Sequence, residues 1–262
     1  MPKPHLLLID GLNFVRPIFE TNPSDDPDKK REGVVKTVGD SFIRALETHR
    51  PTHVAWVFES RGITWRHILY PDYKSSRPEP PPVLLDAVRD VRVNMADQGV
   101  ATLEYPNLEA DDVIGCLAAR ALAAGIEVTV VSTDKDMPYL ISLGAKVYNH
   151  FNRSYRDEAW CLNKMFVRPE QMLDSLALQG DKVDDIPGVA KIGVKIAGQL
   201  LTEYGNLEGV LEAAAAGKIK GVKGKMLVEQ AHLARLSRQL TELKLDCVTE
   251  PLSLSAFRVK NA

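Results

Sequence analysis

The chain has 262 residues and a formal net charge of −2 at pH 7, and 45% of its residues are hydrophobic. It is long enough to bury a core in one large or two small domains. Its three isolated cysteines and six scattered histidines exclude a disulfide framework and the usual zinc-ligand spacings, so a reducing cytoplasm is the expected setting. The apolar run after His5 stops at Asp10 and no run approaches a membrane span, so we expect neither a signal peptide nor a membrane segment.

The first half of the sequence alternates strand and helix patterns. Residues 5–10, 52–59 and 127–134 are short, nearly continuous apolar runs, which are typical of strands buried in a parallel sheet. Apolar residues recur at helical spacing within residues 34–46 and 113–122. This alternation predicts an α/β fold with a mostly parallel sheet flanked by helices.

Each of the three predicted strands ends in an acidic residue, namely Asp10, Glu59 and Asp134. Ligands of open α/β sheets bind beyond the carboxyl ends of the strands, so we expect these carboxylates to share one site. Four further acids extend the set: Glu109, Asp111, Asp112 and Asp136. So many oxygens suit Mg²⁺ or Mn²⁺. Taken alone, residues 109–112 would equally fit the solvated acidic first turn of a helix.

The segment Tyr70–Pro78 combines two tyrosines with Lys74 and Arg77. Aromatic rings can stack on bases and cations can hold phosphates, so this segment is a candidate nucleic-acid contact. The prolines that follow stiffen the chain before a helix that we expect to begin near Val83.

After about residue 168 the strand patterns fade and helical patterns predominate. Asp181 and Asp184, with Asp185 as a further candidate, could add ligands to the metal site. The small residues of Gly188–Gly193 would let backbone N–H groups approach a phosphate, although an ordinary turn between helices is also compatible.

Two patterns close the sequence. Residues 218–225 hold four lysines, which fit either phosphate contact or a solvated loop. Residues 226–245 predict one amphipathic helix that packs against the core.

In order and spacing, these units resemble the 5′ nuclease superfamily, which includes bacterial flap endonucleases, the 5′–3′ exonuclease domain of bacterial DNA polymerase I and stand-alone exonuclease IX-like proteins. The resemblance covers nearly the whole chain. Its motifs are IDGLN (9–13), VFE (57–59), YKSSRP (73–78), EADD (109–112), STDKD (132–136), GD (180–181) and PGVAKIG (187–193).

The resemblance implies two divalent ions, Mg²⁺ or Mn²⁺, held by two groups of carboxylates. The first group would be Asp10, Glu59, Glu109, Asp111 and Asp112. The second group would be Asp134, Asp136, Asp181 and Asp184. The implied catalytic residues are Lys74 and Arg77, close to the scissile phosphate, together with Asp10 and Asp111.

The resemblance also implies a helix-three-turn-helix motif, a hairpin between two helices that holds duplex backbone and binds potassium through main-chain carbonyls. The implied potassium ligands are Leu178, Gln179, Pro187, Val189 and Ile192. The implied DNA contacts are Tyr73, Lys74, Arg77, Gly188, Lys191, Ile192, Gly193 and Lys195.

The chain departs from the family pattern at two positions. Glu59 stands where aspartate is usual, so its carboxylate reaches one methylene further, and Asp185 stands where asparagine is common. The segment between Arg77 and Glu109 is shorter and less basic than an arch that threads single strands. Some stand-alone members lack the second carboxylate group; this chain keeps it, which favours catalysis.

We therefore expect an α/β nuclease core over residues 1–168 and a helical DNA-binding region over residues 169–262. The expected protein is a structure-specific 5′ nuclease, a flap endonuclease or 5′–3′ exonuclease, that hydrolyses DNA near 5′ flaps, nicks or ends with two metal ions. Once the nine expected ligands are set aside, the remaining charge is positive and suits DNA.

We expect a cytoplasmic monomer with no membrane partner. Two alternatives stay open. One is a structure-specific DNA-binding protein with weak nuclease activity. The other is a magnesium-dependent phosphatase, which would need an Asp-x-Asp pair that is missing after the first strand.

Overall fold

The computed structural model describes residues 3–250 and 253–259. They divide into two compact units. The first contains the chain up to Gly62, residues 79–155 and the segment from Lys244 onward, and the second contains residues 63–78 and 156–243. The predicted boundary at residue 168 stays a prediction. The compact units show in addition that the chain after Lys244 returns to the first unit.

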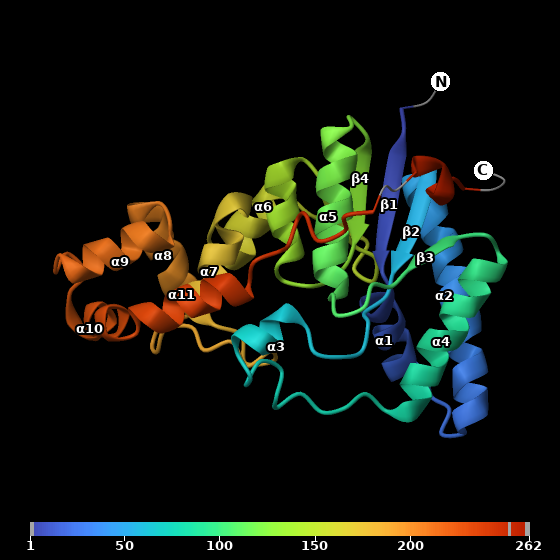
Figure 1. Ribbon diagram of the computed structural model, residues 1–262, viewed down its shortest axis with the longest axis horizontal. Helices are drawn as coiled ribbons and strands as arrows, with labels where there is room; N and C mark the ends of the chain where they lie inside the picture. The colour runs from blue at the N-terminus through green and yellow to red at the C-terminus, as the bar shows by residue number, and fades with distance from the viewer. Residues whose placement is uncertain (1–2, 251–252, 260–262) are drawn as a thin grey trace. The chain divides into compact units, whose positions relative to one another are not determined.

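The first unit is built on a six-stranded sheet in the order β3-β2-β1-β4-β5-β6. Figure 1 labels the first four strands of the chain. Its strands are β1 (His5–Asp10), β2 (His53–Val57), β3 (Ala101–Leu103), β4 (Glu127–Val131), β5 (Lys146–Asn149) and β6 (Ser154–Arg156). The pairs β1–β2, β1–β4, β2–β3 and β4–β5 are all parallel. The predicted α/β fold with a mostly parallel sheet is confirmed.

Helices pack against this sheet. They are α1 (Gly11–Thr21), α2 (Pro27–His49), α4 (Pro82–Asp97) and α5 (Ala110–Ala123), with short 3₁₀ turns η1 (Met137–Leu143) and η4 (Leu254–Phe257). Helices α1, α2 and α4 contact one another, and their apolar sides share one core with Leu7, Ile9 and Trp56 of the sheet. Helix α5 contacts β1 and β4, beside which Figure 1 shows it. The helices predicted within 34–46 and 113–122 are confirmed.

The second unit is helical. Its elements are α3 (Trp65–Leu69), α6 (Glu158–Trp160), η2 (Cys161–Met165), η3 (Pro169–Gln171), α7 (Met172–Gln179), α8 (Val194–Tyr204), α9 (Leu207–Ala215), α10 (Gly221–Glu229) and α11 (Ala231–Leu240). Helix α7 contacts α8 and α11. The buried Arg66 of α3 donates to the carbonyls of Leu240 and Glu242, each at 2.8 Å, so α3 is fastened to the end of α11.

The single helix predicted over residues 226–245 is wrong. The chain breaks at Gln230 (φ −109°, ψ 19°), between α10 and α11, and the second helix ends at Leu240. The side-chain oxygen of Gln230 accepts the N–H of Ala190 at 2.7 Å. The helical spacing of apolar residues could not reveal this contact, because its two residues are far apart in the sequence.

None of the helices within residues 3–250 and 253–259 is both long and apolar enough to cross a membrane.

Candidate active site

Asp10 lies where β1 meets α1. It is the N-cap of α1, and its carboxylate accepts the backbone N–H of Asn13 at 3.1 Å. Only 4% of the residue is exposed. An N-cap carboxylate satisfies a backbone donor that the first helical turn leaves without an intrahelical partner, so the strand end and the helix start together fix its position.

Asn13 links this strand end to the loop after β4. Its side-chain N–H donates to Asp134 at 3.0 Å, and its side-chain oxygen accepts the N–H and the hydroxyl of Thr133 at 2.9 and 2.8 Å. The Ser132 hydroxyl donates to Asp10 at 3.3 Å and accepts the N–H of Asp134 at 3.1 Å. One polar network therefore holds two carboxylates that come from neighbouring strands.

The carboxylates of this network repel one another. Burial raises the pKa of Asp10 well above its usual value, and Asp134 raises it further by its charge and by a side-chain hydrogen bond. Glu59 adds a weaker repulsion, while the N–H of Asn13 acts in the opposite direction. Two such carboxylates cannot both ionise without a cost, which a bound cation would remove.

Three further acids lie at the start of α5. Glu109 is the N-cap and is 3% exposed, and Asp112 is fully buried. Asp112 accepts the N–H of Lys244 at 2.9 Å, and Asp111 accepts the N–H of Asp112 at 2.7 Å. Lys244 begins the C-terminal return to the first unit, so a segment from the far end of the chain orients an acid of the site.

The remaining acids of the first unit lie in loops. Glu59 follows the end of β2, Asp134 follows the end of β4 and Asp136 directly precedes η1. The strands predicted over 52–59 and 127–134 therefore extend slightly beyond the ends of β2 and β4. Among the residues that the structure describes, no three histidine, cysteine, aspartate or glutamate side chains form a ready-made metal-binding group. The structure brings Asp10, Asp134 and Glu59 within electrostatic reach of one another.

In the second unit, the basic segment after α3 is fastened to the acidic loop after α7. Arg77 forms an ion pair with Asp184 at 2.7 Å, and the N–H of Lys74 donates to the carbonyl of Asp184 at 3.0 Å. The N–H and the hydroxyl of Ser76 both donate to Asp185, which lowers the pKa of that carboxyl. Two motifs far apart in the sequence therefore form one structural piece, in which Asp184 is an ion-pair partner of Arg77.

The loop between α7 and α8 is a compact hairpin. Asp181 and Ile186 exchange both backbone hydrogen bonds, and the Asp181 carboxylate accepts the N–H of Val183 at 2.9 Å. Gly188 has φ +61°, and a Cβ atom there would lie 2.3 Å from the nitrogen of Gly180. Only glycine fits at this position.

The hairpin is also held by its neighbours. The N–H of Gly188 donates to the Ser237 hydroxyl at 2.9 Å, so this predicted phosphate donor already has a partner in the fold. Ile192 is 4% exposed, whereas Lys191, Gly193 and Lys195 are exposed. These three are the predicted hairpin contacts that solvent reaches.

The carbonyls predicted to hold potassium belong to the end of α7 and to the hairpin. The carbonyl of Leu178 accepts the N–H of Val189 at 2.8 Å, and that of Val189 accepts the N–H of Ile192 at 3.1 Å. Each carbonyl has a second lone pair. With Gln179 and Pro187, this potassium site stays a prediction.

Tyr73 does not have the exposure that base stacking needs. It is 3% exposed and packs with Ile186 and Leu240, and the Nζ atom of Lys74 lies 5.0 Å from its ring centroid. We therefore assign Tyr73 a packing role in place of the predicted stacking on DNA, because its ring is enclosed by the protein.

Two family models match the chain. The 5′–3′ exonuclease N-terminal resolvase-like domain matches residues 5–166, and the 5′–3′ exonuclease C-terminal SAM fold matches residues 167–262. The chain belongs to the 5′–3′ exonuclease family. Its membership makes it a nuclease of that class, as the sequence predicted.

Relatives of this 5′–3′ exonuclease family member match it over most of its length. Flap endonuclease Xni of Shewanella piezotolerans is 36% identical over 258 residues, which cover 98% of each chain. Flap endonuclease Xni of Colwellia psychrerythraea is 33% identical and covers 92% of this chain and 88% of the relative.

Solved structures share the fold at lower identity. A T5 5′-exonuclease with bound zinc matches with a TM-score of 0.79 at 19% identity, covering 93% of this chain and 91% of that one. The catalytic core of Rad2 in complex with a DNA substrate matches with a TM-score of 0.59 at 14% identity, covering 95% of this chain and 82% of that one.

Sequence reasoning missed the residues that position the acids of this family member. Asn13 had a detectable signal, because it is a polar residue one turn after Asp10 on the same helix start. Lys244 had none, because it acts through its backbone N–H, which any residue except proline supplies.

Proposed function

We propose that this 5′–3′ exonuclease family member is a structure-specific 5′ nuclease that hydrolyses DNA phosphodiesters at 5′ flaps, nicks and ends, with Mg²⁺ as its preferred cation. The observation that carries the proposal is the network around Asp10. A buried carboxylate is held beside Asp134 although their charges repel, and this arrangement is useful to a protein that binds a cation there.

The donors of the site fit hard divalent cations. The assigned side chains are all aspartates and glutamates, so they offer oxygens only. We assign the first ion to Asp10, Glu59, Glu109, Asp111 and Asp112. We assign the second ion to Asp134, Asp136, Asp181 and Asp184. When bound, such ions activate water and stabilise the leaving oxygen of a phosphodiester.

Other residues of the chain position the acids of the site and supply positive charge for the phosphate. Asn13 keeps Asp134 oriented relative to Asp10, and Lys244 orients Asp112. Lys74 and Arg77 supply positive charge, which stabilises the negative charge that develops on a phosphate under attack. The ion pair between Arg77 and Asp184 holds that basic segment on the hairpin loop.

We assign duplex binding to the hairpin between α7 and α8. Exposed Lys191 and Lys195 can contact phosphates on a duplex, and such contacts depend on charge rather than on base sequence. The carbonyls around Leu178 and Val189 would bind K⁺ and so fix the hairpin on the backbone. We also propose that the protein acts as a cytoplasmic monomer, for which sedimentation velocity is the test.

A cleavage gel tests the proposal directly. Labelled 5′-flap, nicked, blunt and single-stranded DNA are incubated with the protein and Mg²⁺, and a small phosphate ester is assayed in parallel. We expect cleavage of flap and nicked substrates and none of the ester. Release of phosphate from the ester without DNA cleavage would establish the phosphatase alternative instead.

Paired substitutions separate cleavage from binding. Asp134→Asn with Asp181→Asn should abolish cleavage while flap affinity stays within about tenfold, or about 1.4 kcal/mol. Asp40→Asn changes an exposed acid of α2 and is the matched control, which should cleave normally. Parental cleavage by the double variant would contradict the assignment of the second group. Parental protein that binds flaps and never cuts them would favour the DNA-binding alternative.

A further inference from the structure

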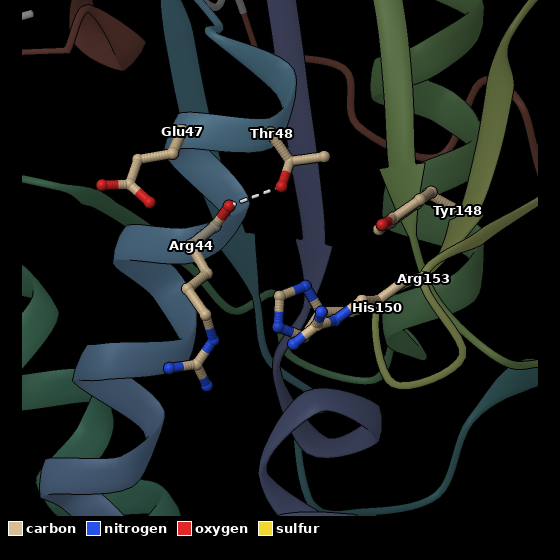
Figure 2. A pocket seen from close by; sticks show the side chains of 6 residues that line it. All are labelled: Arg44, Glu47, Thr48, Tyr148, His150 and Arg153. Carbon is tan, nitrogen blue, oxygen red and sulfur yellow. Dashed lines mark hydrogen bonds between the residues drawn. The ribbon is translucent and has the colours of Figure 1, made fainter.

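A polar cavity of about 250 Å³ opens on the first unit, and none of the residues assigned to catalysis is among those that line it (Figure 2). Figure 2 shows its two walls. Helix α2 supplies one wall, and β5 with the turn after it supplies the other. The lining residues are Arg44, Glu47, Thr48, Tyr148, His150 and Arg153.

Two guanidinium groups dominate the charge of this cavity. Neither Arg44 nor Arg153 is in an ion pair within the part of the chain that the structure describes, although Glu47 lies on the same wall as Arg44. Both lie close enough to His150 to lower its pKa, after the larger effect of burial. The lining therefore holds an excess of positive charge whose natural complement is an anion.

The imidazole of His150 is held in place. The buried Ser41 hydroxyl lies 2.9 Å from Nε2 of His150 and accepts a hydrogen bond from Arg44 at 3.0 Å. The ring of Phe14 lies 4.8 Å from the His150 ring, centroid to centroid. A chain from Arg44 through Ser41 to His150 thus fixes part of the cavity before any ligand arrives, as binding sites require.

The backbone conformation at Arg153 bears separately on the role of its side chain in this cavity. Its φ is +48°, in the left-handed region, at a turn whose N–H donates to the carbonyl of His150. Glycine and asparagine suit such a backbone, and a long side chain does not improve it. Arginine therefore has no backbone advantage over glycine or asparagine at this turn, whereas its side chain lines the cavity.

We propose that this cavity binds a phosphate group, either of a nucleotide or of a DNA strand. Guanidinium groups hold phosphate oxygens in pairs, and a neutral imidazole adds one N–H donor. A phosphate group provides several acceptor oxygens, enough for donors on both walls of the cavity. The proposal is independent of the carboxylate site, because it concerns other residues and needs no divalent cation.

The test is a titration of the full chain in EDTA at constant pH and ionic strength. The ring signals of His150 are followed by NMR and are assigned by comparison with His150→Gln. The probes are inorganic phosphate, dTMP and the dinucleotide dTpT, with chloride as the reference anion. We expect saturable shifts of the His150 signals with phosphate and dTMP and none with added chloride.

Three variants decide whether the cavity is responsible. Arg44→Gln and Arg153→Asn should each weaken phosphate binding by tenfold or more. Arg89→Gln changes an exposed arginine of α4 and should bind like the parent. Arg153→Asn should also melt at the parental temperature or higher, because asparagine tolerates this φ, so its loss of binding is not a loss of folding.

The outcomes either identify the source of the phosphate group or overturn the proposal. Binding by dTpT as tight as by dTMP identifies the backbone of a DNA strand as the source of the phosphate. Binding by the phosphomonoesters alone identifies a free nucleotide or a terminal phosphate. Equal affinity in all three variants, equal shifts with chloride, or no shift with any probe would overturn the proposal. None of these measurements involves cleavage, so each outcome is independent of the nuclease assays.

Discussion

At the scale of single residues, the site depends on a few polar side chains that hold the acids. Asp10 is fixed by its own helix, but Asp134 comes from a loop and is exposed. Loops are mobile unless hydrogen bonds hold them, so the position of Asp134 depends on what binds it. Asn13 and Ser132 supply those hydrogen bonds.

Asn13→Ala should weaken the response to divalent cations without removing a ligand. Removing a side chain that orients a metal ligand typically lowers metal affinity or activity by on the order of 10–100-fold. We expect half-maximal flap cleavage to need at least about tenfold more Mg²⁺, with parental flap affinity in EDTA. Asn94→Ala, at a half-exposed asparagine of α4, is the control. An unchanged Mg²⁺ requirement would show that Asn13 does not position the acids.

Lys74→Ala should slow cleavage far more than it weakens binding. Removing a cation that acts on charge in the transition state typically costs on the order of 10²–10³ in rate. Lys74 has φ +56°, and alanine has the same left-handed penalty as lysine, so folding should not change. Lys182→Ala, at an exposed lysine in the adjacent loop, is the control. Single-turnover rates on a flap substrate measure the effect, and a parental rate would remove Lys74 from the mechanism.

At the scale of elements, the hairpin between α7 and α8 is the most constrained piece of the chain. Its backbone is bonded within itself and to α11, and Gly180 and Gly188 stand where a Cβ atom does not fit. Gly193, by contrast, has open space around it, which provides an internal comparison with Gly188.

Gly188→Ala should destabilise the second unit, whereas Gly193→Ala should not. At Gly188 the new Cβ would be 2.3 Å from a backbone nitrogen and the φ is +61°. At Gly193 φ is −101° and nothing lies within 4 Å of the new atom. We expect a loss of more than about 2 kcal/mol for the first variant and a change within about 0.5 kcal/mol for the second. Urea unfolding and duplex binding should change together, and equal stability of both variants would contradict the hairpin geometry.

At the scale of the whole molecule, buried and half-buried histidines make stability depend on pH. Burial lowers the pKa of His49 to about 4 and lowers those of His5 and His150. The Nε2 atom of His49 is buried without a hydrogen-bond partner in the described structure, so a proton there would have no acceptor. These residues lie at the start of β1, at the end of α2 and after β5, so they couple three elements of the first unit.

The contribution of these histidines to the unfolding free energy should therefore fall as the pH falls from 6.5 towards 4. In this range these histidines bind protons in the unfolded chain that they do not bind in the folded chain, so their contribution to stability rises with pH. Each such histidine contributes at most about 1.4 kcal/mol per pH unit. His49→Gln should reduce the slope of stability against pH, and His232→Gln, at an exposed histidine, should leave it unchanged. Urea unfolding at pH 5 and 7 measures both, and equal slopes in the parent and His49→Gln would refute the assignment.

The amino-acid sequence by itself predicted the central strands, the main helices that cover them and the acidic residues at their ends. These features follow from local rules, because buried strands are apolar runs and parallel strands end on one edge of a sheet. It did not predict β3, β5 and β6, which are only three or four residues long and too short for a clear pattern. It also predicted one helix where α10 and α11 are separated at Gln230.

Only the tertiary structure decided what each candidate residue touches. It showed that Tyr73 is buried, that Arg77 is paired with Asp184 and that Lys244 orients Asp112 through its backbone. It also brought Arg44 and Arg153 to one cavity from elements far apart in the sequence. Such contacts depend on packing between distant segments, and periodicity and motif spacing record only the near neighbours of each residue.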